Sequence, residues 1–103
     1  MAYQITWVTG AIDDLDAIAA YIALDSPTHA AAVIERMLSS ALGLVAFPAA
    51  YRPVPEWNDD AVRQCIVYSY RLIFRVKPDA SLIEILAVVH GARLLPDERR
   101  ARQ

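Results

Sequence analysis

The acid–base chemistry open to this chain of 103 residues rests on four side chains, and no other set of residues in the sequence suits it. These are Glu56, Arg71, Arg75 and His90. A carboxylate and an imidazole can accept and return protons, and guanidinium groups can stabilise the negative charge that develops on a phosphate. If the fold brought the four together, they would meet the requirements of metal-free RNA cleavage.

Structural interpretations compete with this chemistry. If Pro78–Ser81 form a turn, Arg75 lies opposite Glu84, which favours a cross-strand ion pair over a phosphate clamp. His90 follows an apolar run, and a lone histidine at a strand end is more often a hydrogen-bonded structural residue than a catalytic one. We therefore expect no catalytic residues in this chain.

Trp57 and Cys65 are the two other side chains of interest. Trp57 is either a lid over the core or an exposed anchor for a partner, because tryptophan is enriched both in cores and at binding hot spots. Cys65 alternates with apolar neighbours, as a small buried side chain would. A single cysteine forms no internal disulfide, and the histidines provide no zinc-ligand spacing. The sequence indicates neither a metal nor a cofactor.

Composition predicts one folded domain over residues 1–103, with a short basic tail from about residue 94. The chain is 56% hydrophobic and 21% charged, with a mean hydropathy of +0.28, well outside the range of disordered chains. A net charge of −2 suits a polyanion binder poorly, so we expect no direct nucleic-acid binding. We find no apolar run long enough to span a membrane and no secretion leader, and we expect a cytoplasmic protein.

Charge is divided unevenly along the chain. Residues 1–50 carry five acidic side chains and a single basic one, whereas residues 61–103 carry eight basic and four acidic side chains. This pattern suggests a domain that meets a different partner on each side. The partner-binding candidates are Trp57, Arg71, Arg75, Arg93, Arg99 and Arg100. For the arginines of the tail, a solvated chain end is the alternative.

Periodicity predicts the element order strand, two helices, three strands. A strand over Tyr3–Val8 precedes a helix from Ala11 with Thr9 as its cap. Ser26 and Pro27 start a second helix that Phe47 and Pro48 end, and the two helices should form an antiparallel hairpin. Residues 48–61 form a loop, and the final strands are Val62–Val67, Tyr70–Lys77 and Leu82–His90.

The turn at Pro78–Ser81 also predicts which side chains share a face of the last hairpin, with Arg71 opposite Val88. The helices should cover the face made by Leu72, Phe74, Val76, Ile83, Ile85, Ala87 and Val89. The opposite face, half apolar and half cationic, collects Arg71, Ile73, Arg75, Lys77, Glu84, Leu86, Val88 and His90.

Four segments in this order resemble the RelE/ParE superfamily, the toxins of bacterial type II toxin–antitoxin systems. They are Ala11-Ile12-Asp13-Asp14-Leu15-Asp16-Ala17-Ile18 leading through Tyr21-Ile22 to Ser26-Pro27; Phe47-Pro48 with Arg52-Pro53-Val54-Pro55-Glu56; Tyr70-Arg71-Leu72-Ile73-Phe74-Arg75-Val76; and Ile83-Glu84-Ile85-Leu86 with Val88-Val89-His90-Gly91-Ala92-Arg93. The resemblance covers about residues 3–95. It implies an α+β fold in which a small antiparallel sheet carries an N-terminal helical hairpin.

Two activities are known on that fold, and the fold alone does not choose between them. Members similar to RelE cleave mRNA in the ribosome, and members similar to ParE inhibit DNA gyrase without nuclease chemistry. The last strands resemble the ParE branch most, which implies a gyrase inhibitor neutralised by a ParD-like antitoxin in a hetero-oligomer. A RelE-like nuclease using Glu56, Arg71, Arg75 and His90 is the alternative, and a non-toxic antitoxin-binding module is the third possibility.

The helices offer a physical argument for an antitoxin. Alanines recur along both of them, and such small side chains would let another helix approach closely. Helix propensity alone would also explain these alanines. The cationic sheet face could in addition meet an acidic antitoxin segment.

Overall fold

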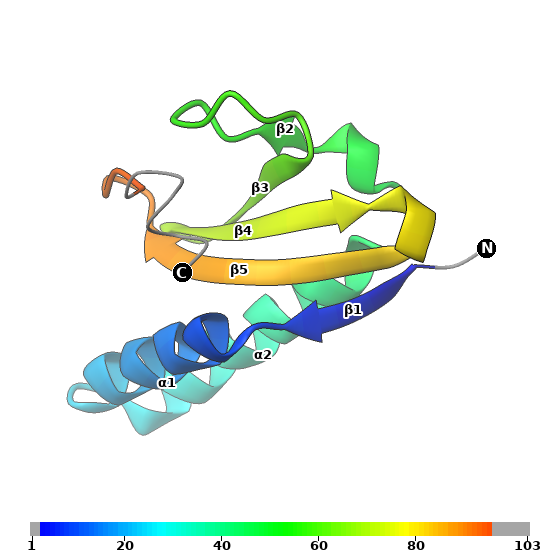
Figure 1. Ribbon diagram of the computed structural model, residues 1–103. Coiled ribbons are helices and arrows are strands. Elements are labelled where there is room, and N and C mark those ends of the chain that lie inside the picture. The colour runs from blue at the N-terminus through cyan, green and yellow to red at the C-terminus, as the bar shows by residue number, and fades with distance from the viewer. Residues whose placement is uncertain (1–2, 96–103) are drawn as a thin grey trace.

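The computed structural model describes residues 3–95, which fold into two helices and a five-stranded sheet (Figure 1). The elements in chain order are β1 (Gln4–Trp7), α1 (Thr9–Ala23), α2 (Pro27–Gly43), β2 (Arg52–Pro53), β3 (Val62–Val67), β4 (Tyr70–Lys77) and β5 (Leu82–His90). The strand order across the sheet is β1-β5-β4-β3-β2. The predicted α+β class and the predicted order of the main elements are confirmed.

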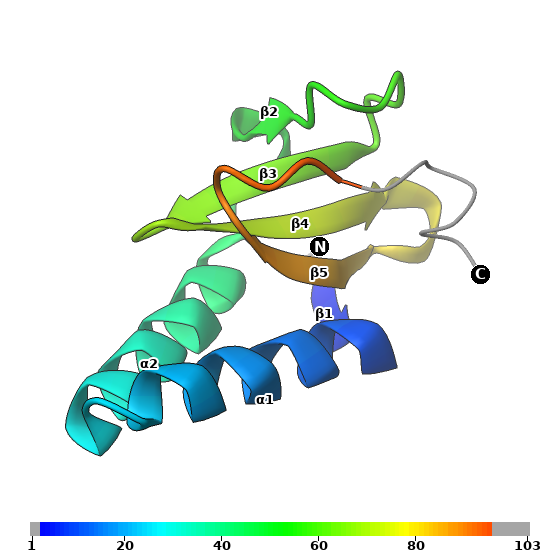
Figure 2. The same cartoon turned by 90° about the vertical axis from the view of Figure 1, so that its left-hand side faces the viewer.

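The two faces of the sheet are covered differently (Figures 1 and 2). Both helices lie side by side on one face, where Met37, Leu44 and Phe74 belong to the main core cluster. The loop over residues 54–61 and residues 91–95 lie over the other face. A second, smaller cluster is buried there, formed by Val54, Trp57, Val62 and Ile73. The side chains of the candidate site belong to this second face.

Local signals placed the helix ends with mixed success. Ser26 caps α2 as predicted, since its hydroxyl accepts a hydrogen bond from the His29 amide at 3.1 Å. Thr9 is not a cap, because α1 begins at Thr9 itself and the capping position is Val8. The second helix ends at Gly43, before the predicted Phe47 and Pro48. Within residues 3–95, neither helix has the length and apolar character needed to cross a membrane.

The sheet is mixed rather than purely antiparallel. β1 pairs in parallel with β5, with Ile5 opposite Ile83, while all other pairs are antiparallel. The first strand of the chain thus pairs with the last one, and the helical hairpin, β3 and β4 lie between them in sequence. The predicted loop over residues 48–61 also contains β2, whose Arg52 pairs with Gln64.

A β-bulge shifts the register of the β4–β5 pair and corrects the predicted faces. Near the turn, Arg75 lies opposite Glu84 as predicted, but Ile73 lies opposite Ala87 while Phe74 lies opposite Ile85. Leu86 is therefore the extra residue, and the side chains that follow it change faces. Val88 enters the main core, whereas Ala87 and Val89 pack against the second cluster. Arg71 consequently lies opposite Val89 and not Val88.

Candidate functional site

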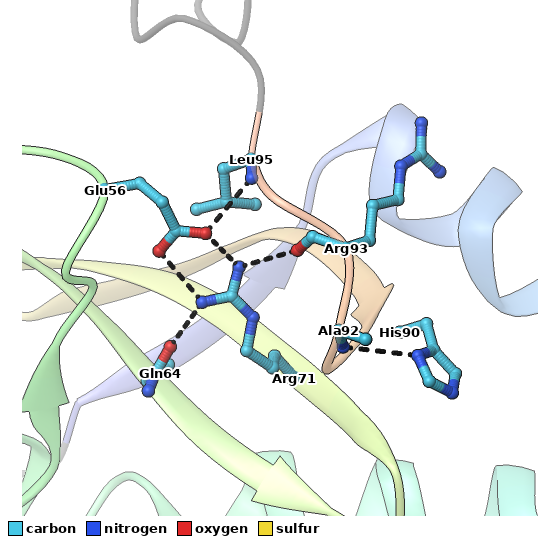
Figure 3. A network of polar contacts seen from close by, with 7 residues as sticks. All are labelled: Glu56, Gln64, Arg71, His90, Ala92, Arg93 and Leu95. Atoms are coloured by element: carbon cyan, nitrogen blue, oxygen red, sulfur yellow. Dashed lines mark hydrogen bonds and ion pairs between the residues drawn. The ribbon is translucent and has the colours of Figure 1, made fainter.

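Arg71 on β4 is the centre of a polar network on the sheet face away from the helices (Figure 3). Its Nη1 donates to Glu56 Oε1 at 3.0 Å, and its Nη2 donates to Glu56 Oε2 at 2.5 Å. Nη1 also donates to Gln64 Oε1 at 2.9 Å. Only 6% of Arg71 is exposed, so the guanidinium is a buried group held by a carboxylate and an amide.

The segment that follows β5 completes the network and covers it. We call residues 91–95 the strap, because they run back across the strands (Figure 2). Arg71 Nη2 donates to the Arg93 carbonyl at 3.2 Å, and the Leu95 amide donates to Glu56 Oε2 at 3.1 Å. At the start of the strap, the Gly91 amide donates to the Ser69 carbonyl at 2.7 Å. The ion pair between Arg71 and Glu56 thus anchors the strap both to the sheet and to the loop that precedes β3.

The electrostatics of the pair follow from this geometry. The hydrogen bonds from Arg71 hold the pKa of the Glu56 carboxyl below its ordinary range, against the opposing effect of burial. Glu56 is therefore ionised and accepts hydrogen bonds instead of delivering protons near neutral pH. The Arg71 Nε atom is buried without a hydrogen-bond partner within the described residues, a cost that the other four bonds of the guanidinium offset.

The other cations of β4 also have partners of their own. Arg75 Nη1 lies 3.0 Å from Asp59 Oδ2, so the predicted ion pair with Glu84 is wrong although the two residues are opposite in register. Glu84 instead pairs with Lys77, at 3.0 Å between Nζ and Oε1. The loop over the second face supplies Asp59, which strand pairing could not indicate. The predicted open cationic face is consequently a set of neutralised pairs.

His90 lies at the exposed end of β5, away from this cluster of contacts (Figure 3). Its Nδ1 accepts a hydrogen bond from the Ala92 amide at 3.2 Å, and its ring meets Tyr70 edge-on with the centroids 5.8 Å apart. These contacts are those of a strand-end residue that organises the start of the strap. The structure brings Glu56 and Arg71 together but does not add His90 or Arg75 to them.

Trp57 and Cys65 are both buried. Trp57 is 8% exposed in the second cluster, so the lid over the core describes it and the exposed anchor does not. Cys65 belongs to the main cluster, and burial raises the pKa of its thiol. Among the residues that the structure describes, no three histidine, cysteine or acidic side chains are grouped as metal ligands would be.

Two residues that the sequence analysis did not single out take part in these contacts. Gln64 is the diagonal neighbour of Arg71, because Ile66 is the residue directly opposite Arg71. The short turn between β3 and β4 fixes this register, so the contact could have been predicted from the sequence. Asp14 accepts a hydrogen bond from the Val88 amide at 2.9 Å, just beyond the bulge. No local pattern in the sequence predicts this hydrogen bond between residues 74 positions apart.

The remaining partner-binding candidates differ in position. The Arg93 side chain is exposed, while its carbonyl holds Arg71. Arg99 and Arg100 lie outside the described residues.

Comparison with known families decides the affiliation of this fold. Residues 5–95 match the model of the ParE toxin of the type II toxin–antitoxin system parDE. The chain belongs to the ParE toxin family. This ParE-family toxin is also 32% identical over 95 residues to Y4kP of Sinorhizobium fredii, whose assigned name is that of a toxin. The match covers 90% of this chain and 93% of the relative.

Solved structures share the fold of the toxin across both branches of the superfamily. A chain of the chromosomal ParDE system of P. aeruginosa superposes with a TM-score of 0.69 at 24% identity, covering 85% of this chain and 95% of that one. A chain of the RelBE2 toxin–antitoxin complex of Mycobacterium tuberculosis gives a TM-score of 0.61 at 24% identity, with 87% and 99% covered. The choice of activity therefore depends on the residues of the site.

Proposed function

We propose that this toxin inhibits DNA gyrase, and that a ParD-like antitoxin neutralises it. The observation that carries the proposal is the state of Arg71, the central residue of the alternative nuclease site. Glu56 and Gln64 occupy its guanidinium beneath the strap, at 3.0 and 2.9 Å from Nη1. A nuclease would need this cation to face a phosphate, and it would need a group free to move a proton.

Neither need is well served by the described residues. Glu56 has a lowered pKa and is bound by Arg71 and the Leu95 amide. Arg75 is paired with Asp59, and His90 stands apart at the strand end. A protein inhibitor of an enzyme needs no such constellation, only a surface that fits its target. The description of the matched family, which names the parDE system, supports the same conclusion.

The test is a supercoiling assay with purified gyrase, adding the toxin alone and then with a co-expressed ParD-like antitoxin. We expect loss of supercoiling or trapped cleaved DNA, and reversal by the antitoxin. Unchanged gyrase activity would contradict the proposal. Translating ribosomes would then serve as the second assay, with His90→Ala as the matched variant because the exposed side chain can be removed without opening the core. Codon-phased mRNA cuts that this variant lacks would establish the RelE-like alternative.

For the antitoxin we propose the groove between the two helices as the docking site. Its volume is about 620 Å³, and alanines form much of its wall: Ala19, Ala20, Ala23, Ala30 and Ala31. Such walls let a partner helix approach the backbone closely. This groove replaces the cationic sheet face as the proposed antitoxin site, because the three β4 cations have partners within the chain.

A pair of alanines on α1 allows a matched test of this groove. Ala20 lines it, whereas Ala17 is also exposed and does not. Ala20→Trp should weaken antitoxin capture by about tenfold or more, since a large side chain would occupy the approach. Ala17→Trp should leave capture unchanged. Equal capture by both variants would place the antitoxin elsewhere. If expression of the unmutated protein did not arrest growth, the protein would be a non-toxic module.

A further inference from the structure

A second cavity, distinct from the helical groove, lies beside the part of β5 that β1 does not pair, where Asp14 of α1 meets the residues of the second cluster. Its volume is about 210 Å³. Six apolar side chains form most of its wall, namely Trp57, Ile73, Leu86, Ala87, Val89 and Leu95. Two polar side chains complete it, Asp14 from α1 and Arg93 from the strap. The β-bulge creates part of the wall, since it turns Ala87 and Val89 toward the second cluster.

Burial arranges these residues by depth. Trp57 and Ile73 are buried and belong to the floor, whereas Asp14 is half-buried and Arg93 is exposed. The deep wall formed by Trp57 and Ile73 is apolar, while one carboxylate and one guanidinium lie nearer to solvent. Asp14 Oδ2 accepts the Val88 amide, and a carboxylate has capacity to accept further hydrogen bonds. The Arg93 carbonyl is bound by Arg71, which fixes the strap and leaves the Arg93 side chain outside the network.

We propose that this cavity is an anchor pocket for one large apolar side chain of the toxin's protein target. The proposal rests on the proposed function only in that the toxin acts by binding a protein. The size supports a single side chain, since sites for whole small molecules usually span about 300–1,000 Å³. The rim suits a peptide, whose N–H can donate to Asp14 and whose C=O can accept from Arg93.

The alternative occupant, a nucleobase, fits the pocket less well. Only two of its lining side chains are polar, and they carry opposite charges, so they offer no basic track for a phosphate chain. The net charge of −2 points the same way. Position separates the pocket from the antitoxin groove, because the one lies beside β5 and the other between the helices. The toxin would thus bind its target and its antitoxin through different surfaces.

Small amides test the pocket without any target protein. We would titrate N-acetyl-leucinamide and N-acetyl-phenylalaninamide and follow the methyl NMR signals of Ile73, Leu86 and Leu95. We expect saturable shifts of these methyls and no shifts of methyls outside the pocket. Absence of saturable shifts there would overturn the proposal, and so would a stronger response of the same methyls to adenosine or uridine.

Filling the pocket provides the second arm. Ala87→Leu should weaken amide binding by about tenfold and reduce gyrase inhibition equally, while antitoxin capture stays unchanged. Ala46→Leu is the control, because Ala46 is exposed and lies outside the pocket. If Ala87→Leu does not fold, Arg93→Ala keeps the backbone carbonyl that binds Arg71 and should show the same selective loss.

The outcomes separate the two proposals. A pocket variant that loses antitoxin capture but keeps gyrase inhibition would overturn the anchor pocket. Unmutated toxin that binds the amides in the pocket and leaves gyrase unaffected would sustain the pocket and overturn gyrase as the target.

Discussion

Glu56 and Arg71 form a bidentate ion pair that joins three separate parts of the chain. The contacts between their four terminal atoms are 3.0 and 2.5 Å, and the side chains are 15% and 7% exposed. Glu56 comes from the loop segment, Arg71 from β4, and both hold the strap through the Leu95 amide and the Arg93 carbonyl. The same contacts that close the alternative nuclease site therefore fix the wall of the proposed anchor pocket.

Removing one partner of this pair should be costly. Glu56→Ala leaves a buried guanidinium without its carboxylate, and losses of about 3–5 kcal/mol are typical of such changes. Urea unfolding measures the effect. Glu84→Ala is the control, because its partner Lys77 is 45% exposed and a surface pair contributes about 1 kcal/mol or less. Equal losses in the two variants would contradict a special role for the buried pair.

The lowered pKa of Glu56 predicts a dependence of stability on acid. A carboxyl whose pKa is lower in the folded state contributes stability above its ordinary pKa and loses it as pH falls through the lowered value. The unmutated protein should thus lose stability below about pH 4 in part through this residue. In Glu56→Gln that part of the decline should be absent when urea midpoints are plotted against pH. An unchanged slope would assign acid sensitivity to other carboxyls.

Asp14 predicts a change of stability with pH that is opposite in sign to that of Glu56. Burial raises the pKa of its carboxyl, outweighing the lowering by the Val88 amide and by Arg93. A raised carboxyl pKa makes the folded state lose stability as pH rises through the window between the ordinary and the raised value. Relative to the unmutated protein, Asp14→Asn should therefore gain stability as pH rises from about 3.5 to 7. A constant difference over this range would contradict the assignment.

Gly91 is required by close approach of the backbone rather than by an unusual dihedral angle. A Cβ there would lie 3.2 Å from the Ser69 carbonyl oxygen, which is backbone and can yield only with its strand turn. We expect Gly91→Ala to destabilise the start of the strap, at a cost of about 1–3 kcal/mol.

The chain offers a matched glycine as a control. Gly43 ends α2, and a Cβ there would meet nothing within 4 Å. Gly43→Ala should stabilise the protein by up to about 1 kcal/mol, because alanine restricts the unfolded chain. Thermal unfolding of both variants should give shifts of opposite sign, and a shift of the same sign would refute the crowding at Gly91.

Most of the elements follow from local sequence. The three C-terminal strands begin and end where alternation and turn residues predict, and Ser26 with Pro27 starts α2 as expected. These features depend on neighbours a few residues apart, so the sequence contains the full physical cause. The burial of Cys65 follows from the same alternation.

Tertiary structure alone decided the site. Nothing local indicates that Leu86 bulges, that Asp59 rather than Glu84 takes Arg75, or that Glu56 closes over Arg71. The partners of Arg71 and Arg75 both come from the loop that covers the second face of the sheet, and a loop without periodicity carries no register that could predict its contacts. The sequence by itself determined the elements and the residue types available for chemistry. Their partners were fixed only when the loop and the strap packed on the sheet, because a charge removed from water is stable only when an opposite charge or hydrogen bonds compensate it.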